Sequence, residues 1–136
     1  NDKKVVFEIL SPKGEVLFEE SNSTSILGRL VYGESEFMLT GDAGIDIEEI
    51  VLKEGWDIDS DVLKLGHHGS KTSSSINFLK AVDPEVVIIS AGENNSYGHP
   101  HKEVVDRVNS LGIKSLATYD LGIITFLSDG KKIYLK

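Results

Sequence analysis

The sequence predicts an α/β domain in which helices flank a mixed β-sheet. Short apolar runs of strand length alternate with segments that repeat apolar residues at helical spacing. The run VVIIS at residues 86–90 is continuously apolar, as is typical of a strand covered on both faces. No repeat, low-complexity segment or linker divides the 136 residues, so we expect residues 1–136 to form one domain.

The first part of the chain predicts three strands. Residues 5–10 form the first strand, and the turn sequence SPKG closes it. A short polar–apolar stretch at 15–20 and a polar loop at 20–25 follow. Residues 26–32 and 36–40 then form a hairpin around Gly33 and Glu34.

The central part predicts alternating helices and strands. A helix over 47–54 is indicated by apolar residues at helical spacing and by Gly55 at its end. The elements that follow are a strand at 61–65, a helix at 74–82 ended by Pro84, the strand at 86–90 and a polar loop at 91–99.

The last part predicts one helix and three strands. Apolar residues repeat at helical spacing over 101–111, and Gly112 follows at the position where glycine commonly ends a helix. Strands are expected at 114–118, 123–127 and 132–135, with a hairpin turn at 128–130. The predicted order is therefore β, ββ, αβ, αβ, αβ, ββ.

Composition excludes several kinds of site. There is no cysteine, so a metal site must use His, Asp or Glu. The net charge of −8 and pI near 4.9 argue against nucleic-acid binding through a broad basic face, but not against one local site. No apolar run is long enough for a transmembrane helix and no signal peptide is visible. The polar start NDKK runs straight into a strand, so we expect residue 1 to be an internal cut of a longer protein.

Polar side chains follow three successive predicted strands. Asp42 follows the strand at 36–40, and His67 and His68 follow the strand at 61–65. Asn94, Asn95, His99 and His101 lie in the loop after residue 90. Ligands of open α/β sheets bind beyond the carboxyl ends of the strands. Together these residues predict a functional site there.

Each cluster also has a structural explanation. Asp42 is a good N-cap for the next helix, and a His–His pair in a Gly/Ser loop is often a solvated turn. The sequence around Pro100 suits a helix start with proline at its first position, and Asn94 and Asn95 are common turn formers. All four histidines of the chain nevertheless fall in two of these loops, with a carboxylate on a third.

One aspartate with two or more neutral imidazoles suits Zn²⁺ or a similar divalent ion, and an aspartate can bridge two metals that activate water for phosphoester hydrolysis. Residues of a strand end alternate in direction, so we expect at most one of His67 and His68 to face the metal. Ser70, Lys71 and the serines at 73–75 suit an anionic substrate at a helix entry, although one serine near residue 74 is explained by helix capping.

The segment GHHGSKT at residues 66–72 matches neither a Ser–His nucleophile nor a Walker A phosphate-binding loop. A Ser70–His68 nucleophile pair lacks the G-x-S-x-G frame, and residues two apart in a turn rarely align. The segment GHHGSKT contains Ser-Lys-Thr but lacks the G-x-x-x-x-G-K frame of a Walker A loop.

Three segments in order resemble one family: FMLTGDA, DVLKLGHHGSKTSSSINFL and DPEVVIISAGENNSYGHPH. They resemble the metallo-β-lactamase-like domain at the C-terminus of the ComEC competence proteins and, less tightly, phosphorylcholine esterases of the same fold. The resemblance covers nearly the whole chain. It implies an αββα sandwich that binds one or two metal ions, zinc or manganese, with Asp42, His67 or His68, and His99 as ligands.

The resemblance further implies a bacterial inner-membrane channel for DNA uptake, with this domain on the extracytoplasmic side and acting as a nuclease. Ser70, Lys71, Asn95 and His101 would then contact substrate. The family's H-x-H-x-D-H or H-x-D-x-D-H loop is absent from the 136 residues. We therefore expect the C-terminal part of the domain, with an incomplete metal site, no activity alone, and dimerisation through an exposed sheet face. The alternatives are a small-molecule phosphodiesterase of this fold and a degenerate, non-enzymatic module.

Overall fold

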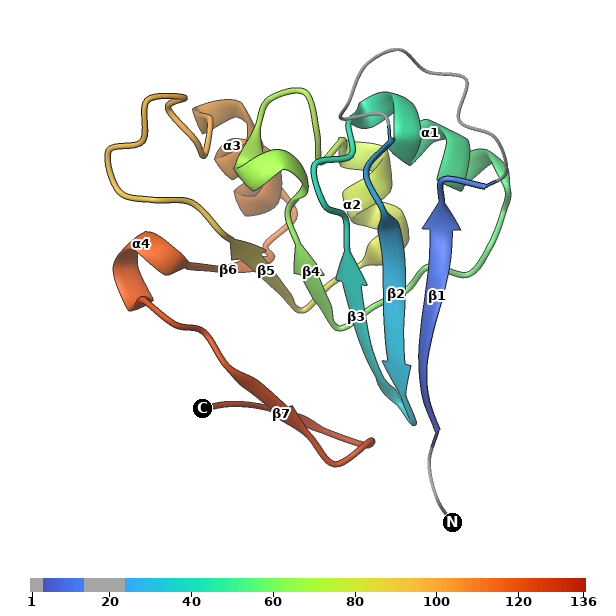
Figure 1. The fold of residues 1–136 in the computed structure, drawn as a ribbon. Helices are drawn as coiled ribbons and strands as arrows, with labels where there is room; N and C mark the ends of the chain where they lie inside the picture. The colour runs from blue at the N-terminus through green and yellow to red at the C-terminus, as the bar shows by residue number, and fades with distance from the viewer. Residues whose placement is uncertain (1–3, 14–23) are drawn as a thin grey trace.

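Six strands form one mixed sheet in the computed structural model, which describes residues 4–13 and 24–136 (Figure 1). The strands follow one another across the sheet in chain order: β1 (Val5–Ser11), β2 (Leu27–Tyr32), β3 (Ser35–Leu39), β4 (Val62–Lys64), β5 (Val86–Ile89) and β6 (Lys114–Ala117). β1, β2 and β3 are antiparallel neighbours, whereas β3 to β6 run parallel. The mixed α/β class predicted from the sequence is confirmed.

Three helices cover one side of this sheet (Figure 1): α1 (Ile45–Lys53), α2 (Ile76–Val82) and α3 (Lys102–Ser110). Their apolar residues, such as Val51, Phe78 and Val104, pack in one buried cluster with alternate strand residues, such as Met38 and Leu63. Each parallel crossover therefore places a helix on this face. The arrangement leaves the carboxyl ends of β3, β4 and β5 together at one edge of the sheet.

The other side of the sheet is only partly covered. A two-stranded hairpin of β7 (Phe126–Ser128) and β8 (Ile133–Leu135) approaches it through Phe126, whose ring centroid lies 6.1 Å from that of Phe37. Contacts of Ser35 with Ser128 and of the Glu34 amide with the Gly130 carbonyl tie the hairpin to the β2–β3 turn. On β1, apolar side chains of this face stay exposed: Val5, Phe7 and Ile9.

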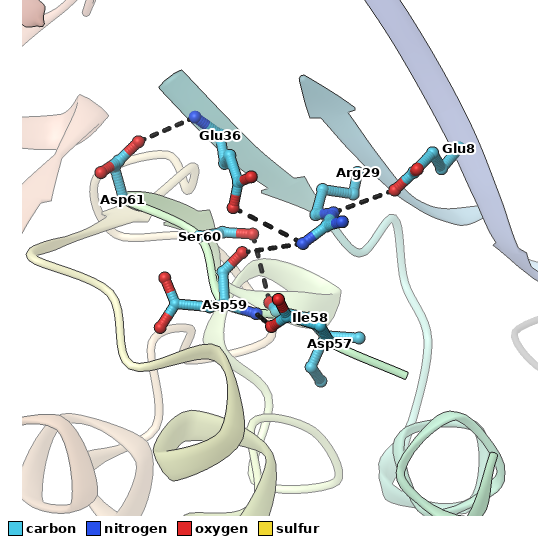
Figure 2. Close-up of polar contacts among 8 residues, drawn as sticks. All are labelled: Glu8, Arg29, Glu36, Asp57, Ile58, Asp59, Ser60 and Asp61. Atoms are coloured by element: carbon cyan, nitrogen blue, oxygen red, sulfur yellow. Dashed lines mark hydrogen bonds and ion pairs between the residues drawn. The ribbon is translucent and has the colours of Figure 1, made fainter. Parts of the chain in front are cut away.

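A charged network joins the antiparallel part of the sheet to the parallel part (Figure 2). The Arg29 guanidinium contacts the Glu8 carboxylate at 3.0 Å, the Asp59 carbonyl at 3.2 Å and the Glu36 carboxylate at 3.5 Å. Asp61 accepts a hydrogen bond from the Glu36 amide at 2.7 Å. Burial raises the pKa of Glu36, and the nearby Arg29 opposes that shift. The network fixes the segment that leads into β4.

The observed structure differs from the predicted elements in a few short segments. Residues 66–69 form the 3-10 turn η2 (Gly66–Gly69), and the strand expected at 114–118 ends at Ala117, where α4 (Thr118–Leu121) begins. The strand expected at 123–127 starts only at Phe126. The helix expected from residue 74 begins at Ile76, because the Ser75 hydroxyl accepts from the Phe78 amide as its N-cap.

Within the described residues, no helix combines the length and apolar character that a membrane crossing requires. The predicted stretch at 15–20 and most of the loop at 20–25 fall outside the residues that the structure describes.

Candidate functional site

Three loops at the carboxyl ends of β3, β4 and β5 hold the predicted polar residues. Asp42 lies in the turn after β3, His67 and His68 lie in η2 after β4, and His99 lies in the loop between β5 and α3. Backbone hydrogen bonds join the loops: the His67 amide donates to Gly41, and the His101 amide donates to Gly69. The topology therefore brings the three clusters together.

The Asp42 turn is anchored to the next strand. The Thr40 hydroxyl donates to the Lys64 carbonyl at 2.7 Å. Helix α1 has Gly44 as its N-cap and no side-chain capping bond, so helix capping does not explain Asp42. Its side chain is 41% exposed, which leaves the carboxylate accessible at the sheet edge.

Lys64 supports this turn from behind. Its ammonium group donates to the carbonyls of Gly41 at 3.3 Å and Leu65 at 3.1 Å. Burial lowers the pKa of Lys64, and the Asp42 charge opposes that shift. The lysine thus places a positive charge close to the candidate metal-binding carboxylate, a feature that the sequence reasoning missed.

His67 and His68 both adopt left-handed backbone conformations, with φ of 45° and 56°. Such angles are uncommon for residues other than glycine and cluster at functional sites. The sequence reasoning assumed an extended strand end with rings on opposite sides, and that assumption is wrong. Instead, the ring centroids of both histidines lie close to that of His99, at 5.4 Å from His67 and 6.5 Å from His68.

His68 is oriented toward Asp42 by the protein. Its Nδ1 contacts the Ser90 carbonyl oxygen at 2.5 Å, and because a carbonyl only accepts, Nδ1 carries the proton. Nε2 faces Asp42 Oδ1 at 3.6 Å. A carboxylate oxygen and an unprotonated imidazole nitrogen both carry lone pairs, so the gap between them suits a cation, either a proton or a metal ion.

His99 completes the cluster. Burial lowers the pKa of His99, and the neighbouring rings of His101, His67 and His68 lower it further, while Asp42 opposes the shift. The neutral imidazole that results is the form that binds metal. His101 caps the other side, because the Lys71 amide donates to its Nδ1 at 3.1 Å and its ring lies 4.8 Å from that of His99.

The hydroxyl-rich segment after η2 is largely used inside the protein. Ser70 is only 5% exposed, and its hydroxyl bonds that of Thr72 at 3.0 Å. The amides of Ser74 and Ser75 at the entry to α2 donate to the buried Glu48 carboxylate. An internal anion therefore occupies the helix entry that was expected to favour an anionic substrate. The Lys71 side chain remains exposed.

Asn95 also turns inward. Its amide nitrogen donates to the carbonyls of Gly92 and His99, and its oxygen accepts from the His99 amide at 3.0 Å. It therefore holds the loop in shape. Beside it lies a cavity of about 460 Å³, lined by His68 and His99 and by residues that the sequence reasoning did not select: Ser90, Tyr97 and Thr118. Thr118 directly follows β6, so the rule that ligands bind beyond the carboxyl ends of strands could have selected it as well.

Asp42 and His68 have a geometry that suits two ligands of one divalent ion, but a complete set of ligands is not arranged among the described residues. Two ligand atoms on one tetrahedral Zn²⁺ lie roughly 3.3–3.6 Å apart, which matches the separation of Asp42 Oδ1 and His68 Nε2. The Ser90 carbonyl bond to His68 is the kind of outer contact that orients metal-binding histidines. Across residues 4–13 and 24–136, however, no group of three or more His, Cys, Asp or Glu side chains is arranged to hold a metal ion.

Several known proteins are similar in sequence to this chain. The chain is 38% identical to ComE operon protein 3 of Bacillus subtilis over 124 residues, which is 91% of this chain. It is 42% identical to Competence protein ComA of Neisseria gonorrhoeae over 90% of this chain, and 42% identical to Recombination protein 2 of Haemophilus influenzae over 76%. No family model matches the chain.

These relatives are much longer than the chain. The aligned region is 16% of the Bacillus protein, 18% of the Neisseria protein and 13% of the Haemophilus protein. Over most of its own length, the chain is therefore similar to a segment of two proteins whose names refer to competence or to the ComE operon, and of one named for recombination.

Proposed function

We propose that this chain is part of a metal-dependent phosphodiesterase domain in a bacterial competence protein that takes up DNA. The observation that carries the proposal is the pairing of Asp42 with an oriented His68 at 3.6 Å, beside His67 and His99. The names of the similar proteins support the competence context. In this proposal the sheet is one half of an αββα sandwich, and the domain lies on the extracytoplasmic side of the inner membrane.

Different residues of the chain would bind the metal ion, contact the substrate and hold the loops in place. Asp42, His67 or His68, and His99 would hold Zn²⁺ or Mn²⁺, and a bound ion supplies an activated water and positive charge near a phosphate. Ser90 keeps His68 in the tautomer that presents Nε2. His101 and the exposed Lys71 lie beside the other histidines. There, His101 would donate a proton to a bound phosphodiester and Lys71 would stabilise its negative charge. Ser70 and Asn95 would contribute indirectly, because their side chains hold the loops around the site in shape.

The chain alone would be inactive in this proposal, because no described group of three ligands can hold the ion. The remaining ligands would come from another part of a longer protein. The same observation favours a second candidate function, that of a non-enzymatic module in a membrane channel. A phosphorylcholine-esterase-like enzyme would use the same residues on small phosphodiesters, and the net charge of −8 suits a small substrate better than DNA.

The test is hydrolysis by the intact protein that carries this chain, with Mn²⁺ or Zn²⁺, of single-stranded DNA and of a small phosphodiester. We expect cleavage of DNA, and a loss of at least about 100-fold in the rate for His68→Ala or Asp42→Ala. Lys80→Ala, an exposed change on α2, is the matched control and should leave the rate unchanged. Cleavage of the small phosphodiester alone would support the esterase, and absence of both activities would support the module.

A further inference from the structure

Tyr97 is the most exposed aromatic residue beside the histidine cluster. The residue is 77% exposed, although it lines the cavity of about 460 Å³ that is also lined by His68 and His99. Its ring lies nearly parallel to that of His99, with a centroid distance of 5.7 Å and an interplanar angle of 21°. One ring face is therefore supported by His99, and the rest of the ring remains open to solvent.

The loop that carries Tyr97 is braced rather than loose. Asn95 closes it with side-chain bonds to Gly92 and to the backbone of His99, and the Gly98 amide donates to the Asn95 carbonyl at 3.1 Å. Asn94 and Gly98 adopt positive φ angles of 53° and 70°, so the chain turns sharply on both sides of Tyr97. These contacts hold an exposed aromatic ring next to the candidate metal ligands.

A planar ligand suits this single exposed ring better than a quaternary ammonium cation does. Quaternary ammonium groups are bound in cages of several aromatic side chains. Among the described residues that line this cavity, Tyr97 is the one aromatic side chain apart from histidine. A nucleobase, in contrast, stacks on a single open ring face, and such stacking tolerates any base sequence.

From this geometry we propose that Tyr97 is a stacking platform for a nucleobase of single-stranded nucleic acid, next to the phosphodiester held by the histidine cluster. The inference rests on the proposed function and narrows its substrate class. It makes Tyr97 a substrate-binding residue with no part in proton transfer. It also gives an acidic protein a route to bind nucleic acid through base contacts as well as through phosphate charge.

The experiment measures binding of the chain, at low ionic strength, to three probes: a fluorescent 12-nucleotide oligothymidine, an abasic sugar-phosphate polymer of equal length, and phosphocholine. Tyr97→Leu keeps side-chain bulk but removes the aromatic face, and we expect it to weaken oligothymidine binding by roughly 5- to 150-fold. Binding of the abasic polymer should not change. Tyr97→Phe should bind as the wild type does, and so should the control Tyr134→Ala, which alters an exposed tyrosine on β8.

Unchanged oligothymidine binding by Tyr97→Leu would overturn the inference and leave the proposed phosphodiesterase intact. An equal loss for both polymers would also overturn it, since it would show a general structural effect. Wild-type chain that binds phosphocholine but neither polymer would overturn the inference and favour the small-molecule esterase. Wild-type chain that binds none of the three would overturn the inference, whereas the proposed nuclease is contradicted only if the intact protein fails to hydrolyse DNA.

Discussion

At the scale of single residues, backbone conformation decides where the histidines point. Two consecutive non-glycine residues, His67 and His68, have positive φ, and Gly69 follows with φ of 84°. A left-handed conformation costs such residues about 1–2 kcal/mol each, so the surrounding contacts must hold them in place. The close approach of Gly69 to Pro100 is one of these contacts, and it positions the loop that carries His99.

Replacing Gly69 by alanine should therefore disturb the site. A Cβ at this position would lie 2.8 Å from the Pro100 Cβ, in addition to the strain of its positive φ. We expect Gly69→Ala to lower the free energy of unfolding by about 2–5 kcal/mol, measured by urea denaturation. Gly112→Ala is the control, because φ is 70° there but no atom lies within 4 Å of the added Cβ. It should cost about 1–2 kcal/mol, and an equal cost for both variants would contradict the role of Pro100.

The histidine cluster should also make the metal-free chain sensitive to acid. The pKa of His99 lies below its ordinary value of 6.5, so the folded chain binds fewer protons than the unfolded chain just below that pH. The free energy of unfolding should therefore fall as the pH drops from 6.5 through the lowered pKa.

Urea denaturation in a chelating buffer at pH 7.5 and pH 5.5 tests this sign. His99→Gln cannot be protonated, so the loss of stability between the two pH values should be smaller for this variant than for the wild type. An identical loss in both proteins would show that another group causes the acid sensitivity.

At the scale of elements, the order of strands and helices follows from the sequence pattern, but the conformation of the site loops does not. Apolar periodicity predicted β5 and α3 within one or two residues of their observed ends. The four residues of α4 are too few to show a helical period. The left-handed turn at His67 and His68 was missed because positive φ is expected for glycine and not for histidine.

The inward use of polar side chains could not be predicted for a different reason. Glu48 accepts from the amides of Ser74 and Ser75, which lie 26 and 27 residues further along the chain. The partners of Asn95 are local, but whether its amide faces the loop or the substrate depends on backbone turns that the sequence does not specify. Three residues predicted from residue type alone, Asp42, His68 and His99, do lie close together.

The Glu48 carboxylate of α1 should stabilise the packing of α1 against the first residues of α2. Burial raises the pKa of Glu48, whereas the bonds from Ser75 and Ser74 and the Arg107 charge oppose that shift. Glu48→Gln would place an amide NH₂ against a backbone N–H and leave a buried donor unpaired. We expect it to destabilise the chain by about 1–3 kcal/mol in urea denaturation.

Glu49→Gln is the matched control for this prediction, because Glu49 is exposed on the same helix. It should change the free energy of unfolding by less than about 0.5 kcal/mol. A similarly small effect of Glu48→Gln would show that the carboxylate does not hold the entry of α2.

At the scale of the whole molecule, the sheet has unequal faces. The helices bury one face, whereas the C-terminal hairpin covers only part of the other (Figure 1). Val5 is 64% exposed, Phe7 48% and Ile9 51%. Phe7 lies in register with Leu30 and Phe37 of the neighbouring strands, and Ile9 with Gly28 and Leu39. Contiguous apolar surface of this kind favours association.

We therefore expect the isolated chain to dimerise through this face, as measured by multi-angle light scattering. The double change Val5→Thr and Ile9→Thr keeps β-branched side chains but reduces apolar area, so it should shift the chain toward monomer. Ile50→Thr alters an exposed apolar residue of α1, which lies on the helix side of the sheet, and should have no such effect. A wild-type chain that is monomeric at all concentrations would contradict the prediction.

Binding of a metal ion at the carboxyl ends of the parallel strands can be tested by nuclear magnetic resonance of the isotope-labelled chain during titration with Mn²⁺, which broadens the signals of nearby amides. We expect the signals of Asp42, His68 and His99 to broaden first. Asp42→Asn should weaken this effect, and the control Asp57→Asn should not. Broadening that starts in the acidic segment 57–61, or that Asp42→Asn leaves unchanged, would contradict a metal site at the carboxyl ends of the parallel strands.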